Sequence, residues 1–141
     1  MTIYVDTSAA VPLFVPEPAS DKVAAWLESC AETLVSADWI LTEFASALAI
    51  KVRRGELMQK HAKAAWEDFE LFAQTGLRLV PVSRGAFARA AQLVRHVRSA
   101  LRSGDALHLA MAIEIEASGI VTTDGQLEKS ALAQGLAVNR F

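Results

Sequence analysis

Thr2-Ile3-Tyr4-Val5-Asp6-Thr7-Ser8 opens the chain with a short β-like run that passes directly into residues suited to begin a helix. The run Ile3 to Val5 has the β-branched and aromatic content of a strand, and Thr7 and Ser8 are both good N-terminal caps. A strand that leads at once into a helix is the first half of a strand–helix–strand unit. This stretch therefore predicts an α/β fold.

The same alternation continues along the chain to its C-terminus. Further strands are expected at residues 33–36, 77–82, 120–123 and 137–140. Helices are expected from a cap at Ser20 to about Cys30, over residues 38–54 and 59–74, after a cap at Ser83, and over residues 105–118 and 126–134. No repeat, low-complexity tract or long linker interrupts this order. We therefore expect a single domain over residues 1–141, with a three-layer α/β/α arrangement around a mostly parallel sheet of about four to five strands.

The composition is that of a globular protein. Among 141 residues, 52% are hydrophobic and 21% are charged, which excludes an intrinsically disordered chain. No run approaches the roughly 20 apolar residues of a membrane span, and the first residues do not resemble a signal peptide. For that reason we expect no membrane partner. Because Cys30 is the only cysteine, we expect a cytoplasmic protein without an intramolecular disulfide. The positive mean hydropathy predicts apolar surface that a homodimer or a permanent partner covers.

Charge is unevenly distributed, although the net charge is only −2. The segment between Val82 and Gly104 has no acidic residue, and we call it the basic sector. Its cationic side chains are Arg84, Arg89, Arg95, His96, Arg98 and Arg102. Such a sector can hold a phosphate backbone, but a solvated border that covers the core explains it equally well. Arg102, just ahead of Asp105, is the first candidate among them for substrate binding.

Four acidic residues stand where an α/β fold brings distant segments together. Asp6 and Asp124 each end a β-like run, whereas Asp105 begins one apolar helical stretch. Glu43 lies within another apolar helix, where a carboxylate needs a cation, a proton or a metal. Each aspartate alone is also explained as a helix cap. Because ligands of open α/β sheets bind at the carboxyl ends of the strands, and converging carboxylates repel one another without a cation, the set predicts a metal site.

The four acids lie in four segments that follow one another in a definite order. The segments are Val5-Asp6-Thr7-Ser8-Ala9, Thr42-Glu43, Leu101-Arg102-Ser103-Gly104-Asp105-Ala106-Leu107-His108-Leu109-Ala110 and Val121-Thr122-Thr123-Asp124. In order and spacing they resemble the successive motifs of PIN-domain ribonucleases, and most closely those of VapC-type toxins of toxin–antitoxin pairs. The resemblance runs from Ile3 to about Val138. It implies a PIN-like fold in which Asp6, Glu43, Asp105 and Asp124 coordinate the metal.

The resemblance also implies which cation and which neighbours to expect. Oxygen ligands of this kind suit Mg²⁺ or Mn²⁺, and hydroxyl support is best matched by Ser8 and Thr122. Gln126 stands where some relatives carry a further acid. None of the three histidines is needed as a general acid or base, and His108 is expected to be structural rather than a ligand.

The implied activity is that of a metal-dependent endoribonuclease. A water activated by the cation attacks the phosphorus in line and leaves a 5′-phosphate and a 3′-hydroxyl. The substrate expected from the family is transfer RNA or ribosomal RNA, and the expected partners are a VapB-type antitoxin and a second copy of the chain. The alternative is a catalytically inactive PIN-like module that binds RNA or a protein partner. A glycine-rich P-loop and a dinucleotide fingerprint are both absent, so a nucleotide cofactor is not expected.

Overall fold

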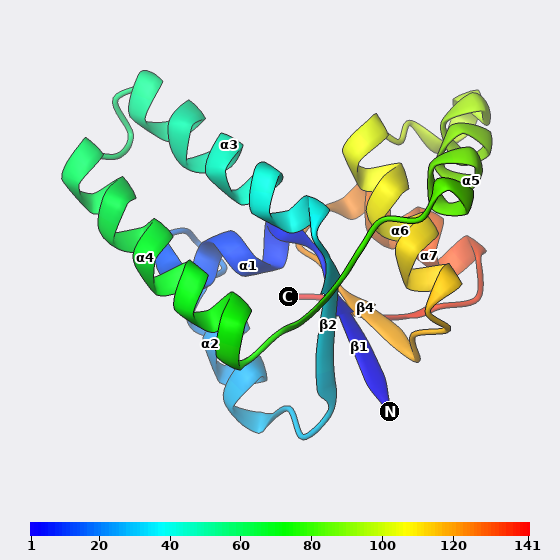
Figure 1. The fold of residues 1–141 in the computed structure, drawn as a ribbon, viewed down its shortest axis with the longest axis horizontal. Coiled ribbons are helices and arrows are strands. Elements are labelled where there is room, and N and C mark those ends of the chain that lie inside the picture. The colour runs from blue at the N-terminus through cyan, green and yellow to red at the C-terminus, as the bar shows by residue number, and fades with distance from the viewer.

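Five parallel strands form one sheet, in the order β3-β2-β1-β4-β5 (Figure 1). The structure is a computed structural model that describes residues 1–141. The strands are β1 (Thr2–Val5), β2 (Thr33–Ala37), β3 (Arg78–Val80), β4 (Gly119–Val121) and β5 (Ala137–Asn139). The helices are α1 (Thr7–Phe14), α2 (Ser20–Ser29), α3 (Trp39–Arg53), α4 (Gln59–Thr75), α5 (Arg84–Arg95), the 3₁₀ turn η1 (Val97–Ser99), α6 (Ser103–Glu114) and α7 (Gly125–Ala133). The predicted α/β/α arrangement is confirmed, and its sheet is parallel throughout.

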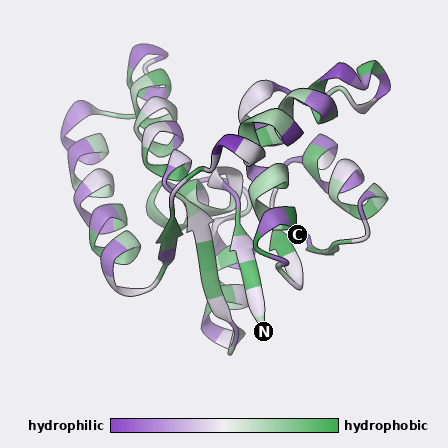
Figure 2. Cartoon of the chain, turned by 45° about the vertical axis from the view of Figure 1, so that its right-hand side comes forward, coloured by the Kyte–Doolittle hydropathy of each residue, from purple (hydrophilic) through white to green (hydrophobic).

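β1 is the central strand and separates two hydrophobic clusters. Its side chains alternate between the two faces of the sheet, as the pleat of a strand requires. Ile3 and Val5 belong to the cluster under α1, α3 and α4, whereas Tyr4 belongs to the cluster under α5, α6 and α7. Figure 2 shows the consequence for hydropathy, with largely apolar central strands between helices that alternate apolar and polar bands. The two clusters hold helices on both faces and leave the carboxyl ends of the strands at one edge.

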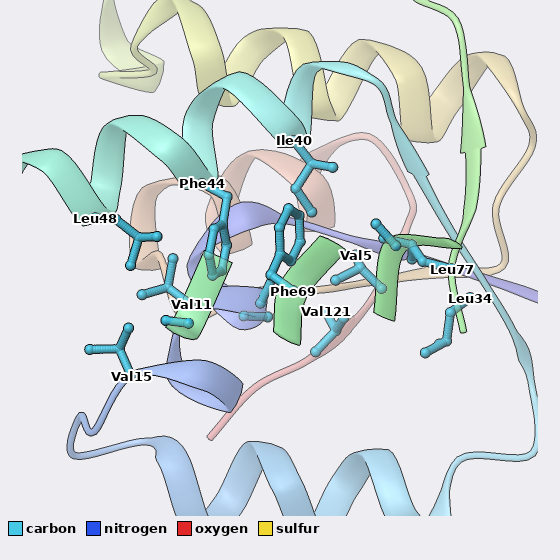
Figure 3. Close-up of a cluster of buried hydrophobic side chains, with 14 of the residues drawn as sticks. Val5, Val11, Val15, Leu34, Ile40, Phe44, Leu48, Phe69, Leu77 and Val121 are labelled. Atoms are coloured by element: carbon cyan, nitrogen blue, oxygen red, sulfur yellow. The ribbon is translucent and has the colours of Figure 1, made fainter. Parts of the chain in front are cut away.

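A stacked aromatic pair joins α3 to α4 within the first cluster. The rings of Phe44 and Phe69 are parallel to within 6°, with centroids 3.8 Å apart, and both side chains are fully buried (Figure 3). Phe14 of α1 packs edge-on against both rings. Because Phe44 follows Glu43 in the sequence, this packing lies next to the part of α3 that carries the predicted ligand.

Some predicted helix boundaries were wrong for local reasons. The cap of α1 is Asp6 rather than Thr7 or Ser8, because the Asp6 side chain accepts from the Ser8 amide. Ser20 is the first residue of α2 rather than its cap, because its hydroxyl instead accepts from the Glu17 amide (2.9 Å) and donates to the Val15 carbonyl (3.2 Å). The predicted helix 105–118 begins earlier and ends earlier, at Glu114, and Glu116 takes a left-handed conformation with φ of 54°. The predicted cap at Ser83 is confirmed, since its hydroxyl accepts from the Ala86 amide at 2.9 Å. No helix is both long and apolar enough to cross a bilayer.

Candidate metal centre

Asp6 follows β1 directly and is almost fully buried at the carboxyl edge of the sheet. Its amide donates to the Val121 carbonyl (3.1 Å), which continues the pairing of β1 with β4 beyond the strand. Its Oδ2 accepts three hydrogen bonds, from the Ser8 amide (3.2 Å), the Ser8 hydroxyl and the Thr122 hydroxyl (3.0 Å). These donors hold the carboxylate in one orientation, and they leave Oδ1 available. Asp6 is therefore a helix cap, as the simpler interpretation held, and a candidate ligand as well.

Asp124 is also a helix cap, at the start of α7. Its Oδ1 accepts from the amides of Gln126 (2.8 Å) and Leu127 (3.3 Å), so that Oδ2 is left for another partner. The Thr122 hydroxyl ties this residue to the first, because it accepts from the Asp124 amide at 3.0 Å while it donates to Asp6. The predicted hydroxyl support from Ser8 and Thr122 is thus present around Asp6.

Asp105 lies in the first turn of α6 but caps nothing. The N-terminal cap position of α6 is Arg102, and no side chain there bonds the helix amides. Burial, and then the negative charges of Asp124 and Asp6, raise the pKa of the Asp105 carboxyl to about 6, against the opposing effect of Arg102. Arg102 Nε lies 3.8 Å from Asp105 Oδ2, and the arginine side chain is 86% exposed. Asp105 is thus a carboxylate whose ionised form lacks a sufficient counter-charge.

Glu43 reaches the same place from the second turn of α3. Its Oε1 accepts from the Thr7 hydroxyl (3.1 Å) and contacts His108 Nε2. Burial raises the pKa of Glu43, but the hydrogen bond and positive charge of His108 outweigh burial, so the pKa lies below its usual range. The second oxygen, Oε2, lies against the backbone of Gly104, where a Cβ atom would be only 2.7 Å away. The missing side chain of Gly104 therefore lets the start of α6 approach Glu43 closely.

His108 occupies the centre of this arrangement and is fully buried. Besides Glu43, its Nε2 lies 3.0 Å from the Thr7 hydroxyl and 3.6 Å from Asp6 Oδ1. Its Nδ1 lies 2.7 Å from the Tyr4 hydroxyl. Burial lowers the pKa of His108, whereas Glu43 and Asp6 raise it by more, and the net direction is upward. His108 lies near Asp105, one turn further along the same helix, but the sequence did not indicate its direct contact with Glu43.

One cleft of about 470 Å³ is lined by all four predicted carboxylates. The hydroxyl-bearing residues Thr7 and Ser8 line it too, and so does Arg102. Two further charged residues belong to the lining: Glu17 Oε1 and Lys51 Nζ form an ion pair at 2.8 Å. Lys51 had a signal in its spacing, since it lies two turns after Glu43 on α3, whereas nothing in the sequence around Glu17 distinguished it from other exposed acids.

The donor atoms in the cleft fit a hard divalent cation. Ligand atoms of Asp6, Glu43 and His108 lie within 4.8 Å of one another, a spacing that permits a shared ion. Asp105 and Asp124 add carboxylates whose mutual repulsion is visible in the raised pKa of Asp105. Carboxylate-rich sites of this kind suit Mg²⁺ or Mn²⁺. A cation placed among these side chains would relieve the repulsion.

Beyond the cleft, the basic sector lies along α5, η1 and the start of α6. Arg89 and His96 line a second hollow of about 400 Å³, which reaches Leu101 next to Arg102. The same elements expose large apolar side chains, with Phe87 56% and Val97 87% exposed. The sector therefore combines cationic residues with uncovered apolar surface.

Comparison with known proteins gives both a family and a fold. The PIN domain family matches residues 3–132. Ribonuclease VapC45 of Mycobacterium tuberculosis (strain CDC 1551 / Oshkosh) is 33% identical over 141 residues, covering 96% of this chain and 93% of that protein. The crystal structure of M. tuberculosis VapC20, described as a sarcin–ricin loop cleaving toxin, has a TM-score of 0.72 at 21% identity, with 91% of this chain and 94% of that one covered. The structure of M. tuberculosis VapBC-5, from the VapBC family of toxin–antitoxin systems, has a TM-score of 0.62 at 17% identity and covers 99% and 97%.

Proposed function

Because the chain belongs to the PIN-domain family and is a relative of the VapC ribonucleases, we propose that it is the ribonuclease toxin of a toxin–antitoxin pair. The observation that carries the proposal is the convergence of four carboxylates in one cleft at the carboxyl edge of the sheet. A PIN-like module that only binds RNA or a protein has no need of such a cluster, because buried like charges cost stability. We extend the proposal to residues 1–141 as one PIN domain.

Asp6, Glu43, Asp105 and Asp124 would hold one or more divalent cations, Mg²⁺ or Mn²⁺. When bound, such a cation supplies an activated water and neutralises charge on the scissile phosphate and the leaving 3′ oxygen. The products are then a 5′-phosphate and a 3′-hydroxyl. The protein orients its own ligands for this role: Ser8 and Thr122 hold one oxygen of Asp6 and leave the other free.

Two positively charged side chains of the cleft lining, those of Lys51 and Arg102, are suited to bind the phosphates on either side of the scissile bond. Lys51 lies eight residues after Glu43 on the same helix, which places it about 12 Å further along α3. Arg102 lies at the other side, ahead of α6, with its side chain exposed. Both line the cleft with the carboxylates. An RNA strand laid between them would present its backbone to Lys51, the carboxylates and Arg102 in turn.

The remaining proposals concern substrate and partners. We propose transfer RNA or ribosomal RNA as the substrate, a VapB-type antitoxin as the inhibitor, and a cytoplasmic location. The antitoxin proposal rests on relatives from VapBC systems. Homodimer formation is supported by the uncovered apolar surface of the basic sector, where Phe87 and Val97 are largely exposed.

Incubation of the purified protein with structured cellular RNA tests the metal-carboxylate activity. We expect internal cleavage with Mg²⁺ or Mn²⁺, none in EDTA, and a loss of activity of at least about 100-fold in Asp6→Asn and Asp105→Asn. Asp21→Asn is the matched control, because Asp21 is an exposed aspartate in the first turn of α2 and does not line the cleft. Cleavage that persists in EDTA or in both cleft variants contradicts the proposal. Retention of RNA without cleavage under every condition supports the binding module instead.

A further inference from the structure

His108 is a fully buried titratable residue that the proposed reaction does not use. It lies in α6 between Tyr4 of β1 and Glu43 of α3, with one ring nitrogen against each. Its place behind the carboxylates raises two possibilities. The ring nitrogen next to Glu43 either binds the cation itself or donates a hydrogen bond to the carboxylate that does.

The hydrogen bonds of the Tyr4 hydroxyl distinguish the two possibilities. The Ala37 amide donates to the Tyr4 hydroxyl oxygen at 3.2 Å, so that the hydroxyl proton must find an acceptor elsewhere. Burial raises the pKa of Tyr4, which keeps that proton in place. The acceptor at hand is His108 Nδ1, at 2.7 Å. With Nδ1 accepting, the neutral ring carries its own proton on Nε2.

Nε2 is therefore a donor, and the acceptor that it faces is Glu43. The imidazolium form also carries a proton on Nε2, so this conclusion holds for either charge state. The Thr7 hydroxyl donates to the same Glu43 oxygen at 3.1 Å. Two donors thus hold Oε1, while Oε2 stands beside Gly104 at the start of α6. One oxygen is fixed by the protein and the other remains for a ligand.

We propose that His108 is a positioning residue: Tyr4 fixes its tautomer, its Nε2–H holds Oε1 of Glu43, and Oε2 is thereby directed to the divalent cation. The inference rests on the proposed function, since it assumes that Glu43 meets a cation in the cleft. It assigns a task to a side chain that would otherwise count only as core. It also removes His108 from the ligand set, although its ring nitrogen lies within 4.8 Å of possible ligand oxygens of Asp6 and Glu43.

Manganese binding measured by calorimetry tests this, with the unfolding temperature of each variant recorded in EDTA. Removal of a residue that orients a metal ligand typically weakens the affinity by about 10- to 100-fold, and this is the loss expected for His108→Leu. His108→Gln should recover most of the loss, because the glutamine amide nitrogen lies the same number of bonds from Cβ as Nε2 and also donates. Tyr4→Phe should weaken binding by about 2- to 10-fold, the equivalent of one hydrogen bond.

The effect of Tyr4→Phe in two backgrounds distinguishes a positioning role of His108 from a general loss of packing. Tyr4→Phe should have no further effect on manganese affinity in the His108→Gln background, because the amide needs no tautomer to be fixed. If His108→Leu does not fold, the comparison of Tyr4→Phe alone with Tyr4→Phe in His108→Gln still decides the matter. Equal manganese affinity in the wild type, His108→Gln and Tyr4→Phe, with only the unfolding temperature lowered, overturns the inference.

Electron spin-echo spectroscopy of bound Mn²⁺ provides the second readout. We expect no ¹⁴N coupling from a coordinated imidazole in the wild type. A ¹⁴N coupling that disappears in His108→Gln would show that His108 is a ligand and would overturn the inference while leaving the ribonuclease proposal intact. A wild-type protein that binds no Mn²⁺ at all contradicts the proposed function instead.

Discussion

Gly104 and Glu43 are in such close contact that a Cβ atom at position 104 would lie 2.7 Å from Glu43 Oε2. The same atom would be 3.4 Å from Trp39 Nε1, so that two side chains of α3 crowd this position. Trp39, one turn before Glu43, thus borders the centre. Absence of a side chain at residue 104 is a condition for the observed carboxylate position.

Gly104→Ala should therefore lower activity without unfolding the protein. Alanine forces the Glu43 carboxylate to move, and displacement of a reacting group by about 1 Å can cost about 100-fold in rate. Stability should change little or rise, because a glycine in a helix is replaced by alanine. Gly85→Ala is the matched control, since Gly85 is also the second residue of its helix and a Cβ there meets nothing closer than 3.7 Å. Equal turnover in both variants contradicts the steric role of residue 104.

The raised pKa of Asp105 predicts how stability depends on pH without a cation. The native protein holds the Asp105 proton up to a pKa of about 6, whereas the unfolded chain releases it near its ordinary value of about 4. The native state therefore binds more protons in this window, and the free energy of unfolding should fall as pH rises from about 4 to 6. Urea unfolding in EDTA measures this slope, and Asp105→Asn should lose that contribution.

Addition of Mg²⁺ should reverse the effect of Asp105, because a cation favours the ionised carboxylate. The increase in unfolding temperature caused by Mg²⁺ should be larger at pH 7 than at pH 5. If the free energy of unfolding has the same pH dependence in the wild type and in Asp105→Asn, the Asp105 carboxyl is not the group with the raised pKa.

Lys51→Ala should weaken RNA binding in a salt-dependent way. If Lys51 contacts one phosphate of a single strand, the slope of log affinity against log salt should decrease by about 0.7. Filter binding in Ca²⁺ or with an inactive Asp6→Asn background measures affinity without cleavage. Lys63→Ala is the control, because Lys63 is an exposed lysine of α4 outside the cleft lining. Equal slopes for the two lysine variants contradict a phosphate contact at Lys51.

Phe69→Ala should lower stability and leave the chemistry of the folded protein intact. Loss of a buried aromatic ring costs about 3–5 kcal/mol, and here the ring stacks on Phe44. Leu71→Ala, on the exposed side of the same helix, should stay within about 0.5 kcal/mol. Urea unfolding gives both values, and manganese affinity below the transition should equal that of the wild type. A loss of affinity in the folded variant would mean that the aromatic stack also positions Glu43.

The strands and most helices were predictable because their signals are local. The passage from Val5 into Thr7, and the cap at Ser83, depend on residues a few positions apart. Convergence of Asp6 and Asp124 also followed from local placement, since a parallel sheet brings the carboxyl ends of its strands to one edge. Whether they hold a metal, and which, stays a prediction.

The side-chain contacts that the sequence did not predict are those for which several hydrogen-bonding or ionic partners were open to the residue. The Ser20 hydroxyl bonds backward to Val15 instead of capping α2, and both outcomes suit a serine in this context. Glu17 and Lys51 meet only because the α1–α2 connection lies against α3. His108 of α6 contacts Glu43 of α3, although the two residues are 65 positions apart in the sequence. The periodicity of hydrophobic residues in a sequence does not indicate contacts between residues so far apart.

Thr122 bonds Asp6 across 116 residues of sequence, and this single contact has a consequence for protein synthesis. The first carboxylate leaves the ribosome early, whereas Asp124 and its threonine belong to the last segments to be translated. A truncated or unfinished product that ends before Asp124 lacks one carboxylate of the cluster. The cluster can therefore assemble only after Asp124 has been translated, and every shorter nascent chain holds at most three of its four carboxylates.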